Sequence, residues 1–248
     1  MSLEVVLLLG LVVLSAHLLE GITGFGCTII ALPFSIVLIG IKMTVPMLTI
    51  LGWIIAAFIV VVDRKELNIK EFIKILSFVL LGLPIGMYFY KYMPEEQLKK
   101  LLGVVMIGIS IKGLYDIFTS NSNKNIVVKD SPFKENILYV YLFLGGIIHG
   151  AFSSGGALVI VYASKKLKGK SEFRATLSAL WLTLNSVILT KYALNDVYTS
   201  ELGFIVLKML PFFIIGMILG NIVHKKLHPA FFTKLVYIVL FISGIFMF

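Results

Sequence analysis

Long apolar runs separated by short polar stretches dominate the hydrophobic pattern of the chain. These runs cover approximately residues 5–19, 27–40, 44–62, 72–90, 98–118, 137–149, 155–164, 175–194, 201–223 and 230–248. Most have the length of a transmembrane helix, because about 20 apolar residues are needed to cross a hydrocarbon core of about 30 Å. They lack the two-residue alternation of outer-membrane strands. The pattern therefore predicts an all-α integral membrane protein.

Two pairs of runs are too short for each member to cross a membrane alone. The first and second runs form one pair, and the sixth and seventh form the other. At 1.5 Å per residue, each of these runs extends only about 20 Å or less. A glycine-rich break separates the two members of each pair: residues 20–26 (EGITGFG) and residues 149–156 (HGAFSSGG). We expect both breaks to lie near the middle of the membrane.

The two breaks indicate an internal duplication. An offset of 129 residues aligns Gly21 with Gly150 and Gly26 with Gly155. Further features recur in both halves: a tryptophan (Trp53, Trp181), a Gly-x-x-x-Gly motif (Gly82, Gly216) and a proline (Pro94, Pro229). We therefore predict a first transmembrane repeat over 1–118, a polar connecting loop over 119–136 and a second repeat over 137–248.

The basic residues predict how the repeats are oriented. If each short pair returns to the side it came from, one side of the membrane carries 16 basic residues and the other carries 5. If each pair crosses instead, the two sides carry 9 and 12 basic residues. The positive-inside rule favours the more unequal distribution, which is 16 to 5. We therefore predict two inverted repeats of five helical segments each, in the cell membrane, with both termini outside. The cytoplasmic loops are then 63–74, 119–136, 165–174 and 224–234.

Composition agrees with this class and excludes several others. The 248 residues are 59% hydrophobic and only 14% charged, whereas soluble domains carry about 25% charged residues. The net charge of +9 lies mainly in short loops, so we predict no nucleic-acid partner. A single cysteine, Cys27, excludes an intrachain disulfide and multi-cysteine metal clusters. We predict no cofactor and no metal.

The two breaks are the predicted substrate site. Secondary transporters with inverted repeats bind their substrate near mid-membrane, at interrupted helices. The free amides at the start of each short helix attract an anion, and Thr28 is among the hydroxyl donors near them. The alternative is that the glycines only allow close helix packing. The predicted substrate-binding residues are Gly21, Thr23, Gly24, Phe25, Gly26, Cys27, Gly150, Ser153, Ser154, Gly155 and Gly156.

Two ionisable residues, Glu20 and His149, occupy equivalent positions beside these breaks. A carboxylate at membrane depth costs at least ~2.5 kcal/mol by insertion scales, so such a residue usually has a function. We predict that Glu20 and His149 couple a proton to the anion. The alternative places Glu20 at an aqueous mouth and makes His149 a hydrogen-bonded bundle residue. Trp181 and Asn185 are secondary site candidates, and the expected role of Arg174 is membrane topology alone.

No catalytic residues are predicted, because the chain has no His-Glu-x-x-His motif, nucleophile elbow or P-loop. Ser153 lies four residues after His149, so a membrane-embedded enzyme stays among the alternatives.

The motif residues resemble a known family. The stretch GITGFGCT from Gly21, followed by Pro33, its partner GAFSSGGA from Gly150, and the Gly-x-x-x-Gly motifs with their prolines are similar to the sulfite exporter TauE/SafE family. The resemblance covers nearly the whole chain. It implies outward transport of sulfite, organosulfonates or related small anions, with the two glycine-rich breaks as the substrate site.

The resulting functional prediction is a secondary transporter of a small sulfur oxyanion, with export, proton coupling and alternating access between the repeats. The alternatives are a carrier of another solute such as a carboxylate, a membrane-embedded enzyme and a scaffold. The predicted partners are the small anion and the lipid bilayer, and the sequence leaves homo-oligomerisation open.

Overall fold

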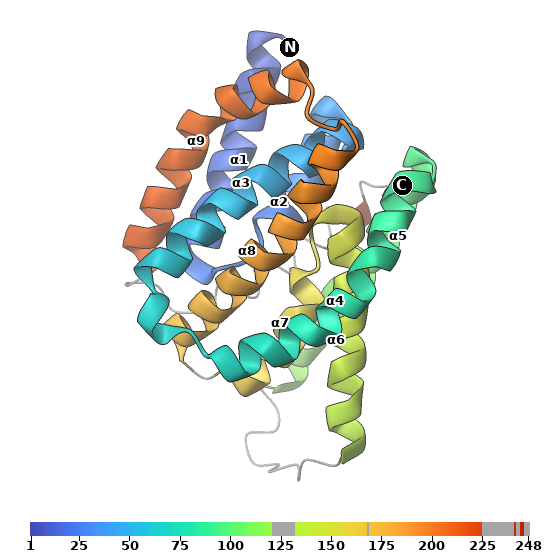
Figure 1. Cartoon of the computed structure of the whole chain (residues 1–248), viewed down its shortest axis with the longest axis vertical. Coiled ribbons are helices and arrows are strands. Elements are labelled where there is room, and N and C mark those ends of the chain that lie inside the picture. Colours follow the sequence, from blue (N-terminus) through green and yellow to red (C-terminus); the bar gives the residue numbers. More distant parts are fainter. Residues whose placement is uncertain (121–131, 168, 225–240, 242–243, 246–248) are drawn as a thin grey trace.

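The computed structural model describes residues 1–120, 132–167, 169–224, 241 and 244–245, and this part of the chain is helical without strands (Figure 1). Five helices are long and apolar enough to cross a membrane, namely α1, α3, α4, α8 and α9, which confirms the predicted all-α membrane class. The helices are α1 (Leu3–Thr23), α2 (Cys27–Ile39), α3 (Ile41–Val62), the 3₁₀ helix η1 (Arg64–Glu66), α4 (Ile69–Tyr92), α5 (Glu95–Ser120), α6 (Pro132–Phe152), α7 (Gly156–Lys166), α8 (Lys170–Leu194) and α9 (Ser200–His224).

The helix breaks are narrower than the sequence predicts. Helix α1 continues through Gly21 to Thr23 and has 21 residues, so the prediction that it is short is wrong. Helix α6 also has 21 residues and continues through Gly150 to Phe152. Only α2 and α7, with 13 and 11 residues, are short. A glycine inside a membrane helix need not interrupt it, because the backbone groups have no water with which to replace their internal hydrogen bonds.

Four glycines bring pairs of helices into backbone contact. A side chain at Gly82 or Gly86 of α4 would collide with carbonyl groups of α6, and one at Gly216 or Gly220 of α9 would collide with carbonyl groups of α1. Small residues at such contacts let membrane helices approach closely. The carbonyl groups belong to Phe143 and Ile147 in α6 and to Leu14 and Leu18 in α1. Since these carbonyls are related by the 129-residue offset of the two breaks, the same packing occurs twice.

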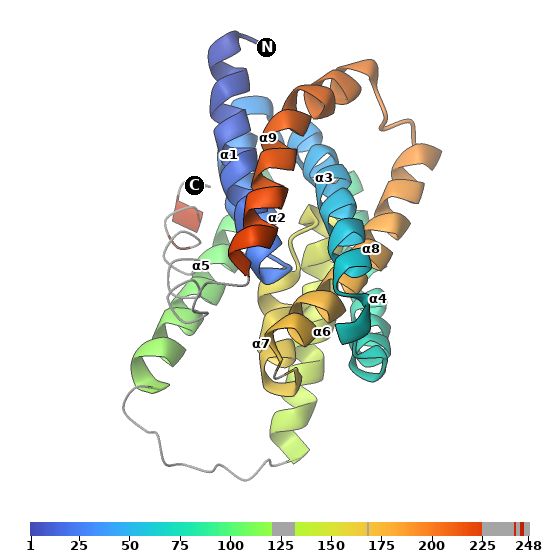
Figure 2. The same ribbon diagram turned by 90° about the vertical axis from the view of Figure 1, so that its left-hand side faces the viewer.

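The two short helices lie in opposite directions. Figure 2 shows α1 descending from the N-terminus to the first break, where α2 turns back upward, and α6 ascending from the other end, where α7 turns back downward. Helices α3 and α8 are antiparallel, since Gly52 lies near Asn185 while Asp63 pairs with Arg174. The side chain of Asn68, which follows η1, donates a hydrogen bond to Glu172. The loops after α3 and before α8 therefore share one end of the molecule, as returning pairs require.

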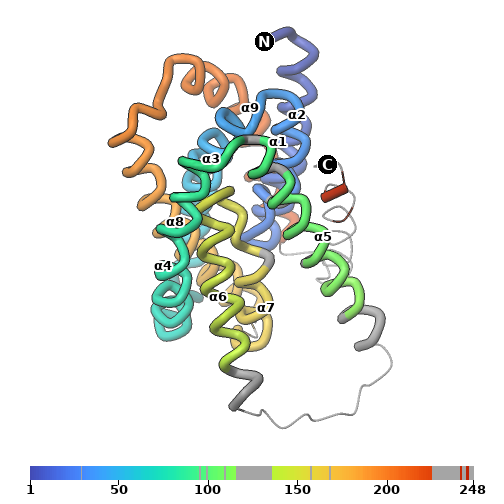
Figure 3. The backbone as a smooth tube through the Cα atoms, turned by 90° about the vertical axis from the view of Figure 1, so that its right-hand side faces the viewer, coloured from blue at the N-terminus to red at the C-terminus, as the bar shows by residue number. Residues whose placement is uncertain are grey.

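The buried apolar side chains form two clusters. One is built mainly from α1, α2, α3 and α9, and the other mainly from α4, α6, α7 and α8. Figure 3 shows α5 at the edge of the bundle, where Lys112 of α5 donates a hydrogen bond to Tyr141 of α6. The tenth predicted segment, 230–248, and much of the loops 119–136 and 224–234 lie outside the described residues. The two clusters position the first and second breaks next to each other.

Candidate functional site

The first break is shaped by glycines with left-handed backbone. Gly24 has φ +79° and its N–H donates to the Glu20 carbonyl at 2.6 Å, which ends α1. Gly26 has φ +97° and begins α2 without a side-chain cap. These φ values favour glycine, because a side chain would meet the following carbonyl. The hydroxyl of Thr23 donates to backbone carbonyls, including that of Phe25 at 2.7 Å, and closes the turn.

The second break repeats the turn at Gly24 with a different residue, whereas Gly155, equivalent to Gly26, has φ −67°. Ser153 has φ +51°, and its N–H donates to the His149 carbonyl at 2.7 Å, as Gly24 does in the first break. A non-glycine residue in this conformation is uncommon and needs support from its surroundings. The Ser153 hydroxyl supplies that support through a 2.6 Å hydrogen bond with Thr49 of α3. Helix α7 then begins after Gly155, again without a side-chain cap.

A small cavity lies between the two breaks. Its volume of about 20 Å³ is close to what one water molecule needs. The first break and its neighbours, the second break, and helices α3 and α8 all contribute to its wall. The lining residues are Glu20, Gly26, Thr28, Gly52, His149, Ser153, Ser154, Gly156, Trp181 and Asn185.

The cavity therefore faces the starts of two helices. Gly26 and Thr28 mark the first turn of α2, and Ser154 and Gly156 mark the start of α7. The first backbone N–H groups of each helix have no intrahelical partner and carry partial positive charge. Two such groups of donors aimed at one cavity favour an anion.

Glu20 is the acidic group of the cavity. Its side chain is 4% exposed and shares a hydrogen bond with the Cys27 thiol, and its Oε2 atom has no hydrogen-bond partner among the described residues. His17 lies one turn earlier on α1, where its Nδ1 donates to the Val13 carbonyl at 2.7 Å. The donor atoms of His17, Glu20 and Cys27 lie within 4.8 Å of one another, close enough that a metal ion could contact all three.

His149 is held from two sides by α8. Its Nε2 bonds Asn185 Oδ1 at 3.0 Å, and its ring stacks on Trp181 with 5.1 Å between centroids. The indole N–H of Trp181 donates to the carbonyl of Gly24 at 3.1 Å. Helix α8 therefore connects the second break to the first, and both secondary candidates lie in the site.

Other predicted site residues lie outside the cavity wall. Gly21 packs against the backbone of Gly220, Gly150 against Leu83, and Gly155 against Gly145. These three glycines serve close packing, which was the alternative interpretation. A second group, comprising Thr23, Gly24, Phe25 and Cys27, shapes or supports the first break without lining the cavity.

Two residues of α3 were missed by the sequence interpretation. Gly52 lines the cavity, and Thr49 holds Ser153. The repeat offset gives a signal for Gly52, because position 52 is equivalent to Trp181. Thr49 is one of two threonines in α3, and nothing local in the sequence distinguishes it from Thr44.

Comparison with protein families identifies the chain. The family model described as Sulfite exporter TauE/SafE matches residues 8–247. The chain belongs to the TauE/SafE family. This confirms the resemblance carried by the two glycine-rich breaks, and it makes the protein a membrane transporter of a small anion, not an enzyme. No curated protein and no solved structure has significant similarity to the chain.

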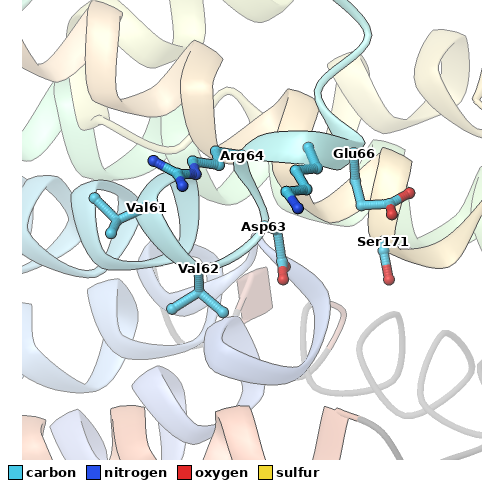
Figure 4. Close-up of a pocket in the computed structure, with 7 residues that line it drawn as sticks. Val61, Val62, Asp63, Arg64, Glu66 and Ser171 are labelled. Carbon is cyan, nitrogen blue, oxygen red and sulfur yellow. The ribbon is translucent and has the colours of Figure 1, made fainter.

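This TauE/SafE transporter also has a larger pocket at the end of α3 (Figure 4). Behind it, Asp63 pairs with Arg174 at 3.2 Å, and Arg174 donates to Asn221 of α9 at 2.8 Å. Arg174 is 1% exposed and lies against Gly24, so its role extends beyond topology. The pocket has a volume of about 680 Å³ and is lined by Val61, Val62, Asp63, Arg64, Lys65, Glu66 and Ser171.

Proposed function

We propose that this protein is a secondary transporter that exports a small sulfur oxyanion, such as sulfite or an organosulfonate, across the cell membrane. The observation that carries the proposal is the convergence of two uncapped helix starts on one small cavity. Buried N–H groups and helix dipoles favour a small anion there without a cationic side chain.

The anion is bound mainly by backbone groups. The N–H groups after Gly26 and Gly155 face it from the two breaks, and a hydroxyl group from each side, Thr28 and Ser154, completes the shell. Gly26 contributes space, because nothing lies within 4 Å of where its Cβ would be. This arrangement binds negative charge while keeping the side chains of the wall small.

Glu20 and His149 are the proposed proton-coupling groups. An ionised Glu20 repels an anion in the same cavity, and a protonated Glu20 tolerates it. His149 faces the same space from the second break. Binding of the anion and binding of a proton therefore favour each other.

Alternating access follows from the size of the cavity. A sulfur oxyanion has several heavy atoms, and about 20 Å³ accommodates only a water molecule, so the walls must separate for binding and release. We propose that the repeats 1–118 and 137–248 move against each other. The glycine contacts join α1 to α9 and α4 to α6 and therefore lie between the repeats, so this movement has to rearrange them.

The Asp63–Arg174 pair lies at the end of the molecule that the charge count assigns to the cytoplasm. We propose that this pair closes the cytoplasmic side and that the pocket beyond it admits the anion. The proposed topology keeps both termini outside and the loops 63–74, 119–136, 165–174 and 224–234 inside.

The test is counterflow in proteoliposomes. Vesicles preloaded with unlabelled sulfite should take up sulfur-labelled sulfite, and external sulfite, sulfonates or thiosulfate should compete for it. A variant with Gly26→Leu fills the cavity and should abolish exchange, whereas Gly203→Leu in α9, where a Cβ has open space, should retain it. Competition by carboxylates alone would indicate a carboxylate carrier, and no exchange of any anion would refute the proposal.

A further inference from the structure

Two side chains at the second break, those of His149 and Ser153, present lone pairs and not hydrogens, while the Ser154 hydroxyl beside them can donate. We propose that the cavity therefore selects anions that carry a hydrogen-bond donor of their own, such as hydrogensulfite, over anions of equal charge without one. This inference rests on the proposed function, since it concerns the substrate of that same site.

The first step concerns the tautomer of His149. Its Nε2 atom bonds the amide oxygen of Asn185, and an oxygen only accepts, so the hydrogen of the neutral ring is on Nε2. Nδ1 is then a bare acceptor, and it has no partner among the described residues. The ring is 2% exposed and is fixed by its stacking on Trp181, so it does not turn to offer a donor instead.

The second step concerns Ser153, which is 6% exposed. The hydroxyl of Thr49 already donates to the Val45 carbonyl at 2.7 Å, so in the 2.6 Å contact between the two hydroxyls the hydrogen comes from Ser153. Ser153 therefore offers the cavity only oxygen lone pairs. Its neighbour along the wall, His149, does the same with nitrogen.

The third step concerns the other titratable groups that face this space. From α1, Glu20 presents Oε2 without a partner, and behind it His17 presents Nε2, also without a partner. From α2, Cys27 directs its thiol toward Glu20. From α8, Arg174 is directed toward Asp63 and Asn221 and does not line the cavity.

The ligand that matches this wall has two properties. Its oxygens accept from the N–H groups at the starts of α2 and α7, and a hydrogen of its own reaches His149 Nδ1. A fully deprotonated anion would bring oxygen lone pairs against buried acceptors, and leaving buried polar groups unpaired is strongly unfavourable. Sites built to bond a substrate O–H discriminate strongly against analogues without it. We expect discrimination of at least about tenfold here.

The test uses pairs of similar monoanions in one mildly acidic buffer. Hydrogensulfite is compared with methanesulfonate, and hydrogencarbonate with nitrate, as competitors of labelled sulfite counterflow. The proposal expects the donor-bearing member of each pair to compete at least about tenfold more strongly. Equal competition within both pairs would overturn it while leaving anion transport intact. Absence of any counterflow would instead refute the proposed function.

Variants test whether His149 is the source of the selectivity. His149→Gln places an amide that can donate a hydrogen bond. Methanesulfonate and nitrate should therefore compete more strongly, relative to hydrogensulfite and hydrogencarbonate, than they do in the unmodified protein. Asn185→Leu removes the oxygen that fixes the tautomer of His149. It should therefore also reduce the ratio of competition by the donor-bearing anion to competition by the donor-free anion. His224→Gln alters a buried histidine outside the cavity wall and should leave the ratio unchanged. Unchanged ratios in both test variants would remove His149 from the explanation and overturn the proposal.

Discussion

The first and second breaks share the turn that ends their first helix and differ in their side chains. Gly24 and Ser153 are equivalent by the 129-residue offset, both have positive φ, and both return a hydrogen bond to the carbonyl four residues earlier. The residues that supply those carbonyls are Glu20 in one break and His149 in the other. The same turn thus occurs with an acidic residue beside it in one break and with a histidine in the other.

The largest expected effect comes from substitutions at the glycine contacts, which occur in both halves. Gly86→Leu and Gly220→Leu each force a side chain into the backbone of a neighbouring helix, and overpacking in such contacts costs upward of about 3 kcal/mol. We expect both variants to yield little folded protein. Size-exclusion profiles and thermal melts in detergent measure this.

Gly108→Leu is the matched control, because nothing lies within 4 Å of its Cβ position. If only one of the two glycine variants disrupted the fold, the two halves would not pack equivalently.

Exchanging the residues at the left-handed positions comes next. Gly24→Ser introduces a side chain against Arg174 in a strained conformation, so we expect a loss of about 2–4 kcal/mol in the free energy of unfolding. Ser153→Gly relieves the strain but loses the hydrogen bond with Thr49, and these effects of about 1 kcal/mol each should nearly cancel. Denaturation in mild detergent compares the two directly. A comparable loss in both variants would contradict the interpretation of the backbone.

Glu20→Gln tests the role of the acidic residue at the first break. An amide keeps the size of the side chain but holds no exchangeable charge, so uptake driven by a proton gradient should fall at least about tenfold. Counterflow without a gradient should be retained, because the N–H groups that hold the anion are untouched. Gradient-driven uptake and counterflow are measured in the same vesicles. Loss of neither would show that Glu20 has no part in coupling.

The smallest expected effect distinguishes two equivalent hydroxyls. Thr49 and Ser178 are related by the repeat offset, but Thr49 bonds Ser153, whereas the Ser178 hydroxyl has no partner in the part of the chain that the structure describes. Thr49→Val should therefore destabilise the protein by about 1 kcal/mol, and Ser178→Ala should be nearly neutral. Thermal melts of the two variants, side by side, decide this. A reversed order would mean that Ser178 has a partner in the folded membrane state.

The sequence predicted the parts of this molecule that depend on local pattern. Apolar runs of helical length identified the membrane helices, and the spacing of glycines identified the two breaks. Glu20 and His149 were selected as candidates because an ionisable group inside an apolar run is conspicuous, and both residues line the cavity. All three signals are visible within a few residues of chain.

What the sequence did not predict depends on which face of a helix is turned inward. Gly21 and Gly150 were expected at the substrate, yet they face neighbouring helices, because a glycine in a membrane helix serves packing as readily as binding. Gly52 lines the cavity although its immediate neighbours in the sequence are apolar. Arg174 was expected to mark topology, but its partner Asp63 is 111 positions away and only the fold brings them together.

The indole of Trp181 touches both breaks, since its N–H bonds Gly24 and its ring stacks on His149. The chain has only one other tryptophan, Trp53, which is 37% exposed. Fluorescence from the buried indole is thus an internal probe of the cavity, and it needs no attached dye. Entry of an anion that separates the breaks would alter its emission, while the surface indole would stay unchanged and provide the reference signal.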